Sequence, residues 1–201
     1  MPYLYLIRHG QTDWNEKKII MGKKDISLNQ NGKTEINTIV KTINNVKFDA
    51  LYCSPIKRAV ESAELIAKKI KLTPTLCEPF TEIPLDMWEG EKAKKLMDTD
   101  VNFKLYWKSP EKAILSYGKS IKDFQKDVWK GVLDIQNKHP EGNICIVTHM
   151  DTIKIILCKT LGLNIKFLHR LKIQNGSLSI LNCANDDSYL EVLNYKPARK
   201  F

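Results

Sequence analysis

The chain has 201 residues, 43% of them hydrophobic and 27% charged, which is typical of one globular domain with a large core. No stretch approaches the roughly 18 consecutive apolar residues of a membrane-spanning helix, and Met1-Pro2 leads into an apolar segment rather than a basic leader. We therefore expect a single cytoplasmic domain over residues 1–201 with no membrane partner.

The formal net charge of +9 is compatible with binding a polyanion such as nucleic acid. Most lysines, however, stand between apolar residues at helical spacing, as in Lys92-Ala93-Lys94-Lys95-Leu96, which is typical of solvated helix faces. We therefore expect no nucleic-acid partner, although the positive field would attract a small anionic substrate. The 5 cysteines include no Cys-x-x-Cys pair and are odd in number, so we interpret them as reduced core residues.

The first predicted strand covers residues 3–7, a short apolar and aromatic run. It ends in a loop that begins with Arg8 and His9. Apolar residues at helical spacing then predict a helix over residues 31–45.

A second strand is predicted over residues 48–53. Ser54 and Pro55 follow it, and they fit the N-cap and the first position of a helix that extends to Ile70. The first third of the chain thus has the order strand, helix, strand, helix.

The middle of the chain, about residues 74–120, is irregular in pattern and rich in Pro, Glu, Lys, Trp and Tyr, so we interpret it as an inserted lid segment. Regular spacing returns afterwards and predicts a helix over 121–135, a strand over 143–148, a helix over 153–161, and two final strands, 177–181 and 189–194, around a turn at 185–187. This alternation predicts an α/β fold, a three-layer sandwich with a mostly parallel central sheet and a lid-like insertion.

Three predicted strand ends carry candidate functional residues. Arg8 and His9 follow the first strand, Ser54 and then Arg58 follow the second, and His149 follows the strand over 143–148. Ligands of parallel sheets bind beyond the carboxyl ends of the strands, where loops and helix N-termini meet. One histidine at a strand end is usually structural, but two histidines and two arginines at one edge favour a phosphate site.

The segment from Leu6 to Asn15, with the sequence L-I-R-H-G-Q-T-D-W-N, resembles the signature of the histidine phosphatase superfamily, which includes the phosphoglycerate mutases. Five further motifs follow in the family's order, from about Tyr3 to Leu181 overall: Asp25-Ile26-Ser27-Leu28 with Gly32, Cys53-Ser54-Pro55 with Arg58-Ala59, Glu82-Ile83 with Trp88-Glu89-Gly90, Thr148-His149, and Asn175-Gly176-Ser177. A lone Arg-His-Gly would be weak, whereas several ordered motifs are strong evidence.

The resemblance implies a role for each matching position: His9 as the phosphorylated nucleophile, Arg8, Arg58 and His149 as the phosphate clamp, Asn15 as a further phosphate contact, and Glu82 as the general acid. The chemistry of these groups agrees. A neutral imidazole has one lone pair to attack phosphorus, and neighbouring guanidinium groups keep it neutral. Arginine forks match phosphate oxygens and stabilise the charge that shifts during transfer, so we expect no metal and no cofactor.

The stretch 82–90 resembles the broad-specificity phosphatases of the family more than its cofactor-dependent mutases, which favours a phosphatase over a phosphoglycerate mutase. Three positions depart from the usual pattern. Leu85-Asp86 stands where Phe-Gly is more common, Met150 stands where glycine usually follows the second histidine, and Lys119 stands where glutamate is usual. Met150 is a candidate substrate contact that narrows the pocket.

Two other classes of function stay open at this point. A non-catalytic phosphate-binding module would need the arginines but neither His9 nor Glu82, and a nucleic-acid binder would lose affinity steeply with salt. The expected partner is a small phosphorylated substrate, whose identity the motifs leave undefined. The oligomeric state is also undefined, with a homodimer among the options. His139 and His169 have no motif context, so we interpret them as structural or surface residues.

Overall fold

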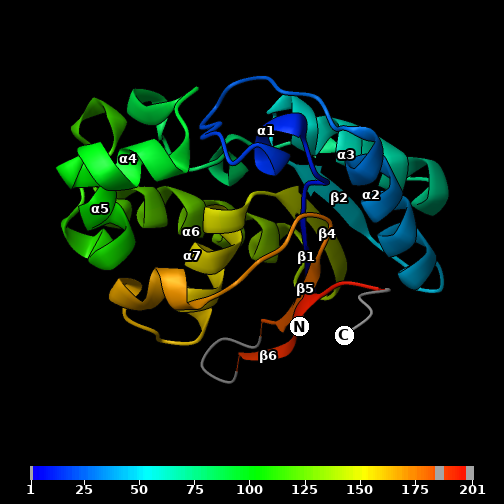
Figure 1. The fold of residues 1–201 in the computed structure, drawn as a ribbon. Helices are drawn as coiled ribbons and strands as arrows, with labels where there is room; N and C mark the ends of the chain where they lie inside the picture. Colours follow the sequence, from blue (N-terminus) through cyan, green and yellow to red (C-terminus); the bar gives the residue numbers. More distant parts are fainter. Residues whose placement is uncertain (1, 184–187, 198–201) are drawn as a thin grey trace.

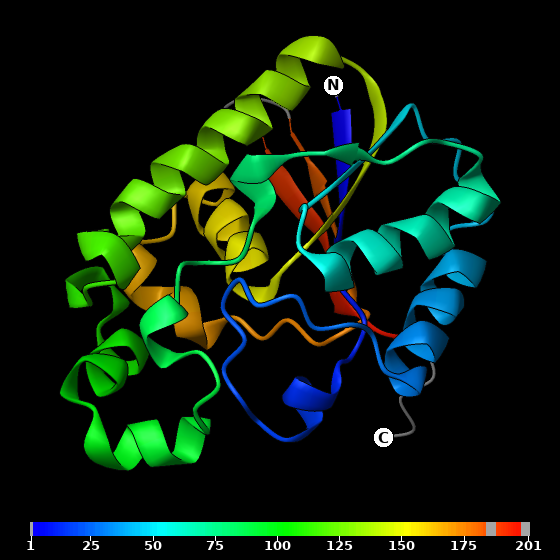
Figure 2. The same cartoon turned by 90° about the horizontal axis from the view of Figure 1, so that it is seen from above.

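The computed structural model describes residues 2–183 and 188–197. They form a three-layer α/β sandwich around a 6-stranded sheet with the order β3-β2-β4-β1-β5-β6 (Figures 1 and 2). The strands are β1 (Pro2–Arg8), β2 (Ala50–Cys53), β3 (Thr75–Leu76), β4 (Gly142–Thr148), β5 (Leu178–Asn182) and β6 (Tyr189–Tyr195).

Seven α-helices and five 3₁₀ helices join these strands in the described part of the chain. The α-helices are α1 (Asp13–Glu16), α2 (Gln30–Thr42), α3 (Lys57–Ile70), α4 (Ala93–Thr99), α5 (Val101–Lys108), α6 (Ile121–Lys138) and α7 (Met150–Thr160). The 3₁₀ helices are η1 (Glu78–Phe80), η2 (Asp86–Trp88), η3 (Pro110–Lys112), η4 (Ser116–Gly118) and η5 (Ile165–Arg170).

The first four strands are parallel, and β5 and β6 are antiparallel to their neighbours. In the register of β1 and β4, Arg8 lies opposite Thr148, so the two strands end side by side. β2 pairs with the other side of β4 and ends at Cys53, opposite Val147. The carboxyl ends of β1, β4 and β2 therefore meet at one edge of the sheet. The α/β fold with a mostly parallel central sheet is confirmed.

The two faces of the sheet are covered by different helices, as Figure 1 shows. Side chains alternate between the faces along each strand. In β4, Ile144 and Ile146 pack in the core that includes α6 and α7, whereas Cys145 and Val147 pack in the core that includes α2 and α3. This alternation gives the middle layer two buried faces, as expected for a three-layer sandwich.

The predicted elements outside the middle segment are all present, with shifts of a few residues at their ends. The main correction concerns Ser54, which we expected to cap the second helix with Pro55 as its first residue. That helix, α3, begins at Lys57 after an extended Ile56, and no side chain caps it. The Ser54 hydroxyl instead accepts a hydrogen bond from the Ile56 N–H at 3.2 Å and contacts His149. The predicted turn at 185–187 lies outside the described residues.

The middle segment, 74–120, contains β3, α4, α5 and η1 to η4 (Figure 2). Its aromatic residues pack inside the domain: Phe80, Trp88, Phe103 and Tyr106 join the same core as α6 and α7. The Trp88 and Phe103 rings meet edge to face with their centroids 5.0 Å apart. Short elements with one or two buried aromatic residues leave no long period in the sequence, which is why this segment was irregular in pattern. Its movement as a lid stays a prediction.

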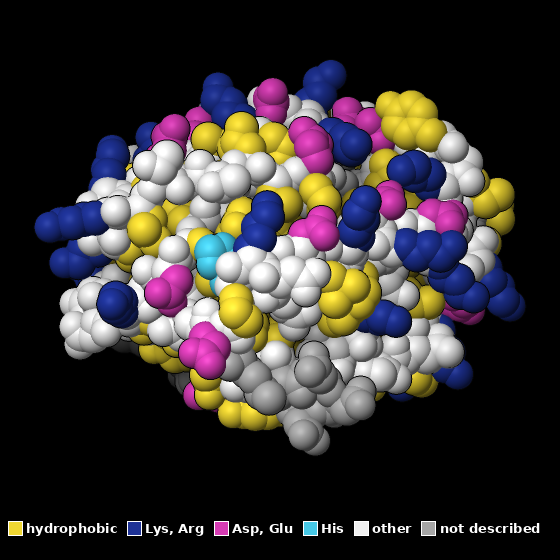
Figure 3. Space-filling model, turned by 180° about the vertical axis from the view of Figure 1, so that it is seen from behind, with side chains coloured by type: hydrophobic (Ala, Val, Ile, Leu, Met, Phe, Trp, Pro, Cys, Tyr) yellow, Lys and Arg dark blue, Asp and Glu magenta, His cyan; other side chains and the backbone are white. Residues whose placement is uncertain are grey.

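Two surface properties bear on the expected partners. In the described part of the chain, no helix combines the length and the apolarity needed to cross a membrane. On the face drawn in Figure 3, lysine and arginine side chains are interspersed with acidic and apolar ones. All cysteines are free, and only Cys77 among them is partly exposed, in agreement with reduced core residues.

Candidate active site

The predicted site residues meet at the edge where β1, β2 and β4 end. His9 and His149 follow β1 and β4, and their ring centroids lie 5.2 Å apart. Arg58 comes from the first turn of α3. All these side chains are almost inaccessible to solvent: His9, Arg58 and His149 have 0% exposure, Glu82 has 8% and Arg8 has 9%. The edge of the sheet thus carries a buried cluster of two histidines, two arginines and one carboxyl group.

The His9 ring has a defined orientation. Its Nδ1 lies 2.8 Å from the Gly10 carbonyl oxygen, which only accepts hydrogen bonds, so Nδ1 carries the proton. Nε2 then has the lone pair, and it accepts a hydrogen bond from Arg58 Nε at 3.3 Å. Burial, and then the charges of Arg58 and Arg8, hold the pKa of His9 well below its usual value. His9 is therefore neutral at cellular pH, with its free nitrogen turned toward a guanidinium group.

The backbone around His9 is fixed by the close approach of two glycines. A Cβ atom on Gly10 would collide with the Gly32 carbonyl in α2, which explains the glycine in each motif. The Gly10 N–H donates to Ser62 Oγ at 3.2 Å, and the Gly176 N–H donates to the His9 carbonyl at 3.1 Å. The loop after β1 is thus held from α2, from α3 and from the segment before β5.

Arg58 is held in place by two backbone carbonyls of the loop before α2. Its Nη1 donates to the Lys24 oxygen at 2.9 Å and its Nη2 to the Gly22 oxygen at 2.7 Å. Burial lowers the pKa of Arg58 to about 10, so the group stays charged at neutral pH. Both contacts fix the plane of the guanidinium and leave other N–H groups for a ligand.

Arg8 is anchored on one side only. Its Nη1 donates to the Ile173 carbonyl at 2.8 Å, whereas its buried Nε has no hydrogen-bond partner among the described residues. A buried donor without a partner is costly, and an anion that accepts from it removes this cost.

Glu82 is positioned by two threonines that flank His149. Thr148 Oγ1 donates to the Phe80 carbonyl at 2.7 Å, and Thr152 Oγ1 donates to the Thr81 carbonyl at 2.6 Å. These bonds attach the Glu82 segment to the junction of β4 and α7. Burial, followed by the negative charge of Asp151, raises the pKa of Glu82 to about 7, although Arg58 opposes the shift. Close to neutral pH, Glu82 can therefore both give and take a proton.

His149 contacts a residue whose role the sequence motifs did not reveal. Its Nε2 lies 2.7 Å from Ser54 Oγ, and its buried Nδ1 has no hydrogen-bond partner among the described residues. Burial and the charge of Arg58 hold the pKa of His149 well below its usual value. The Cys53-Ser54-Pro55 motif indicates this contact only when it is known that β2 lies next to β4 in the sheet.

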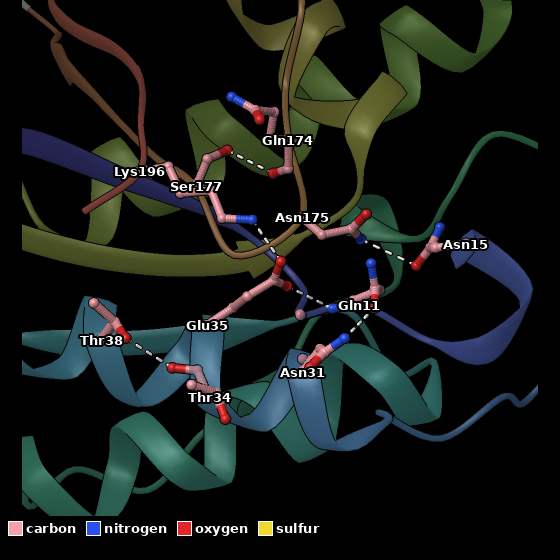
Figure 4. Close-up of polar contacts among 12 residues, drawn as sticks. Gln11, Asn15, Asn31, Thr34, Glu35, Thr38, Gln174, Asn175, Ser177 and Lys196 are labelled. Atoms are coloured by element: carbon pink, nitrogen blue, oxygen red, sulfur yellow. Dashed lines mark hydrogen bonds and ion pairs between the residues drawn. The ribbon is translucent and has the colours of Figure 1, made fainter. Parts of the chain in front are cut away.

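Asn15 lies at the rim of the cluster, where Figure 4 shows it facing Asn175. Its Oδ1 accepts from Asn175 Nδ2 at 3.0 Å and from the Thr12 N–H at 3.1 Å. The oxygen of this amide is thus occupied, and the Nδ2 group is the part that can donate to a phosphate. Met150, the first residue of α7, is half-buried and lines a cavity next to Arg8.

A second buried group, which the sequence analysis did not identify, lies on α7. The Asp151 carboxylate pairs with Lys154 at 3.0 Å and accepts from the Tyr106 hydroxyl at 2.5 Å. Both charged side chains are at most 3% exposed. The helical pattern of α7 gave no sign of this pair, because a buried ion pair has the same spacing as a solvated one. The Asp151 charge acts on two residues of the site: it raises the pKa of Glu82, and at Arg8 it partly opposes the lowering of the pKa by burial.

Asp86 and Lys119 are the other two positions that depart from the usual family pattern. Among the described residues, neither is hydrogen-bonded or ion-paired to Arg8 or Arg58. Asp86 is half-buried and accepts from the Tyr117 hydroxyl at 3.3 Å. Lys119 pairs with Asp127 at 3.4 Å on the surface. Within residues 2–183 and 188–197, no group of three or more His, Cys, Asp or Glu side chains has the arrangement of a metal site.

Nearly the whole chain matches one known protein family. The model of the histidine phosphatase superfamily (branch 1) matches residues 4–196. The chain belongs to this superfamily. The family that the sequence motifs predicted is thereby confirmed, together with the assignment to its phosphatases.

Individual proteins also resemble the chain over nearly its full length. Phosphoserine phosphatase from Entamoeba histolytica, solved in complex with 3-phosphoglyceric acid, is 30% identical with a TM-score of 0.87, covering 98% of both chains. YhfR from Bacillus stearothermophilus is 25% identical with a TM-score of 0.89, covering 96% of this chain and 97% of its own. Phosphoserine phosphatase 1 from Hydrogenobacter thermophilus is 25% identical over 184 residues, 90% of this chain and 87% of its own.

Proposed function

We propose that this protein is a phosphomonoester phosphatase that acts through a phosphohistidine on His9, without a metal, on a small anionic metabolite. The observation that carries the proposal is the state of the His9 ring. Its Nδ1 donates to the Gly10 carbonyl, so the Nε2 lone pair faces the Arg58 guanidinium, and the charge of Arg8 also acts on the ring. A lone pair beside two guanidinium groups is the arrangement that phosphoryl transfer to a neutral imidazole requires.

In the first step, the His9 Nε2 lone pair forms a bond to phosphorus while the bond from phosphorus to the ester oxygen breaks. Arg8 and Arg58 stabilise the charge on the phosphoryl oxygens. Arg58 Nε, which donates to Nε2 in the ligand-free site, then donates to a phosphoryl oxygen instead. His149 is a further donor to the same group.

The leaving oxygen takes a proton from Glu82, whose raised pKa of about 7 keeps much of it protonated at neutral pH. In the second step, the Glu82 carboxylate accepts a proton from water as the water oxygen attacks phosphorus. The bond between nitrogen and phosphorus breaks, its electron pair returns to His9, and inorganic phosphate leaves. One carboxyl group thus serves both steps and ends in its starting state.

The proposed substrate is a small phosphorylated metabolite with a further negative charge. Two of the similar proteins are called phosphoserine phosphatases, and one of them was solved with 3-phosphoglyceric acid. Both of these ligands carry a carboxylate besides the phosphate, and an excess of basic residues is suited to attract such anions.

The decisive experiment measures both phosphate release and enzyme labelling. Purified protein is incubated with a panel of phosphomonoesters, including phosphoserine and both phosphoglycerates, and is also quenched in alkali during turnover. We expect free phosphate, and a phosphoryl label on His9 that survives alkali and is lost in acid. His9→Ala should lose label and turnover together. Turnover without any label, or normal turnover by His9→Ala, would refute the phosphohistidine mechanism.

Phosphoglycerate mutase activity is the second candidate, since it begins with the same phosphohistidine. The same panel separates the two, because a mutase converts one phosphoglycerate into the other and releases little free phosphate. Interconversion that greatly exceeds phosphate release would replace the phosphatase proposal with the mutase.

A further inference from the structure

A cavity of about 680 Å³ adjoins the candidate active site on the side of Arg8. Three of its lining residues belong to the cluster or directly adjoin it. Arg8 belongs to the cluster, Met150 follows His149 in the chain, and Asn175 hydrogen bonds to the His9 carbonyl at 3.3 Å. The cluster and this cavity therefore share Arg8.

The charged residues that line this cavity are mostly positive. They are Arg8, Lys154, Arg170, Lys172 and Lys196, against the single carboxylate of Glu35. Glu35 is already paired with Lys196, and Figure 4 shows it also accepting from the Gln11 backbone. In the part of the chain that the structure describes, Arg8, Arg170 and Lys172 have no ion-pair partner.

Two of these cations are buried in the cavity wall and are the strongest evidence for a ligand. Lys154 is 2% exposed, and its ammonium group lies 5.9 Å from the centroid of the Trp107 ring. Asp151 is its one hydrogen-bond acceptor among the described residues, so further N–H groups can still donate. Arg8 is 9% exposed, and its Nε has no partner in the same residues. Buried cationic donors in excess of acceptors are stabilised by an anion that supplies the missing acceptors.

We propose that this cavity binds a second anionic group of the substrate, a carboxylate, while the phosphate lies against His9. This inference rests on the proposed function and defines its substrate class: small phosphomonoesters whose carbon chain also carries a carboxylate. Arg8 lies between the two anions and contacts both. The other cavity near the site, smaller at about 380 Å³, has a mixed lining, with Lys23, Lys119 and Lys130 against Glu78 and Asp127, and so offers a weaker attraction.

The test compares two substrates that differ only in the second anion, 3-phosphoglycerate and glycerol 3-phosphate. The carboxylate of the first is a hydroxymethyl group in the second. We expect the wild-type kcat/KM to favour 3-phosphoglycerate by at least about tenfold, the usual effect of a charge-assisted hydrogen bond. The ratio of the two values does not depend on the fraction of active enzyme, so partial misfolding of a variant does not distort it.

Two exposed lining residues allow substitution with little risk to the fold. In the double variant Arg170→Gln/Lys172→Met, we expect the preference to fall below about threefold, because kcat/KM falls more for 3-phosphoglycerate than for glycerol 3-phosphate. The control is Lys119→Met, which removes one lysine from the other cavity and should leave the preference unchanged. Lys154→Met should also reduce the preference, and Lys154→Arg should restore part of it.

Three results would overturn the inference: no preference in the wild type, a preference that survives the double variant, or a preference lost in Lys119→Met. The aryl ester p-nitrophenyl phosphate, which has no carboxylate, distinguishes failure of the second-anion site from failure of the proposed function. If the wild type hydrolyses that ester with no preference between the paired substrates, only the second-anion site is wrong. If it hydrolyses none of them, the phosphatase proposal itself fails.

Discussion

Arg58 Nε donates a 3.3 Å hydrogen bond to His9 Nε2, so the guanidinium is already at the atom that would attack phosphorus. Its two terminal nitrogens are held by the Gly22 and Lys24 carbonyls. The side chain of Arg58 thus connects the candidate nucleophile with the loop before α2. Its shape, and not only its charge, is needed for this connection.

The first prediction follows from that geometry. Arg58→Lys keeps a positive charge but has no planar fork to bond both carbonyls and the phosphate. We expect kcat/KM for p-nitrophenyl phosphate to fall by about 10²–10³-fold, the usual effect of losing a preorganised donor. Arg170→Lys, on the exposed wall of the cavity, serves as the control and should hydrolyse this ester normally. Full activity in Arg58→Lys would show that a point charge is sufficient.

The second prediction separates Glu82 from Asp86. Glu82 interacts electrostatically with Arg58 and Arg8, whereas Asp86 contacts the Tyr117 hydroxyl. We expect Glu82→Gln to lower kcat for alkyl phosphates by about 10²–10⁴-fold, and for aryl phosphates by less, since a phenolate leaves with little protonation. The matched variant Asp86→Asn should show no dependence on the leaving group. The reverse pattern would move the acid role to Asp86.

The third prediction concerns pH. Glu82 must be protonated to assist the leaving group, and its pKa is about 7, so kcat for alkyl phosphates should decline as pH rises above about 7. Asp151 is one cause of the raised pKa, after burial. Asp151→Asn should therefore move this decline to lower pH, whereas Asp127→Asn on the surface should not. An unchanged pH profile in Asp151→Asn would exclude this electrostatic coupling.

The fourth prediction concerns stability and follows from the same pKa. Below about pH 4.5, Glu82 is protonated in both the folded and the unfolded chain, so its ionisation does not affect stability. As pH rises toward 7, only the unfolded chain ionises, and the free energy of unfolding falls by up to an amount on the order of 3 kcal/mol. The free energy of unfolding of Glu82→Gln does not fall in this way, because glutamine does not ionise. Urea unfolding at pH 5 and pH 8 should show that the variant gains stability relative to wild type as pH rises; a constant difference would contradict the raised pKa.

The fifth prediction is that turnover persists in EDTA. The arginines and histidines supply the positive charge that phosphoryl transfer needs, and in the described ranges no carboxylate or histidine group has metal-site geometry. The measurement is phosphate release before and after chelation. Loss of activity that added Mg²⁺ restores would require a different mechanism.

The convergence of Arg8, Arg58 and His149 could be predicted because the parallel sheet brings strand ends to one edge, and strand ends are readable as short apolar runs. The contact of Ser54 with His149 could not, since it joins residues far apart in the chain and depends on the order of β2 and β4 in the sheet. Local capping rules favoured a different role for the same serine.

The buried pair of Asp151 and Lys154 was hidden for another reason. Its spacing on α7 is the usual spacing of a surface ion pair, and its burial depends on residues from another helix, such as Tyr106, which donates to Asp151. Likewise, the raised pKa of Glu82 comes from burial and from Asp151, both of which are set by tertiary structure. The types of the site residues and the neutral state of His9 were readable from sequence, whereas the raised pKa of Glu82 was not.

The two threonine hydroxyls that bind the Phe80 and Thr81 carbonyls have a consequence for how the enzyme can diversify. Thr148 and Thr152 attach the chain just ahead of Glu82 to the same rigid junction that carries His149. These two bonds therefore fix the position of Glu82 relative to His149, independently of the helices in residues 83–120. That later segment can change in sequence while the backbone next to Glu82, the proposed proton donor, keeps its place. Variation in the middle segment is thus separated from the placement of this carboxyl group.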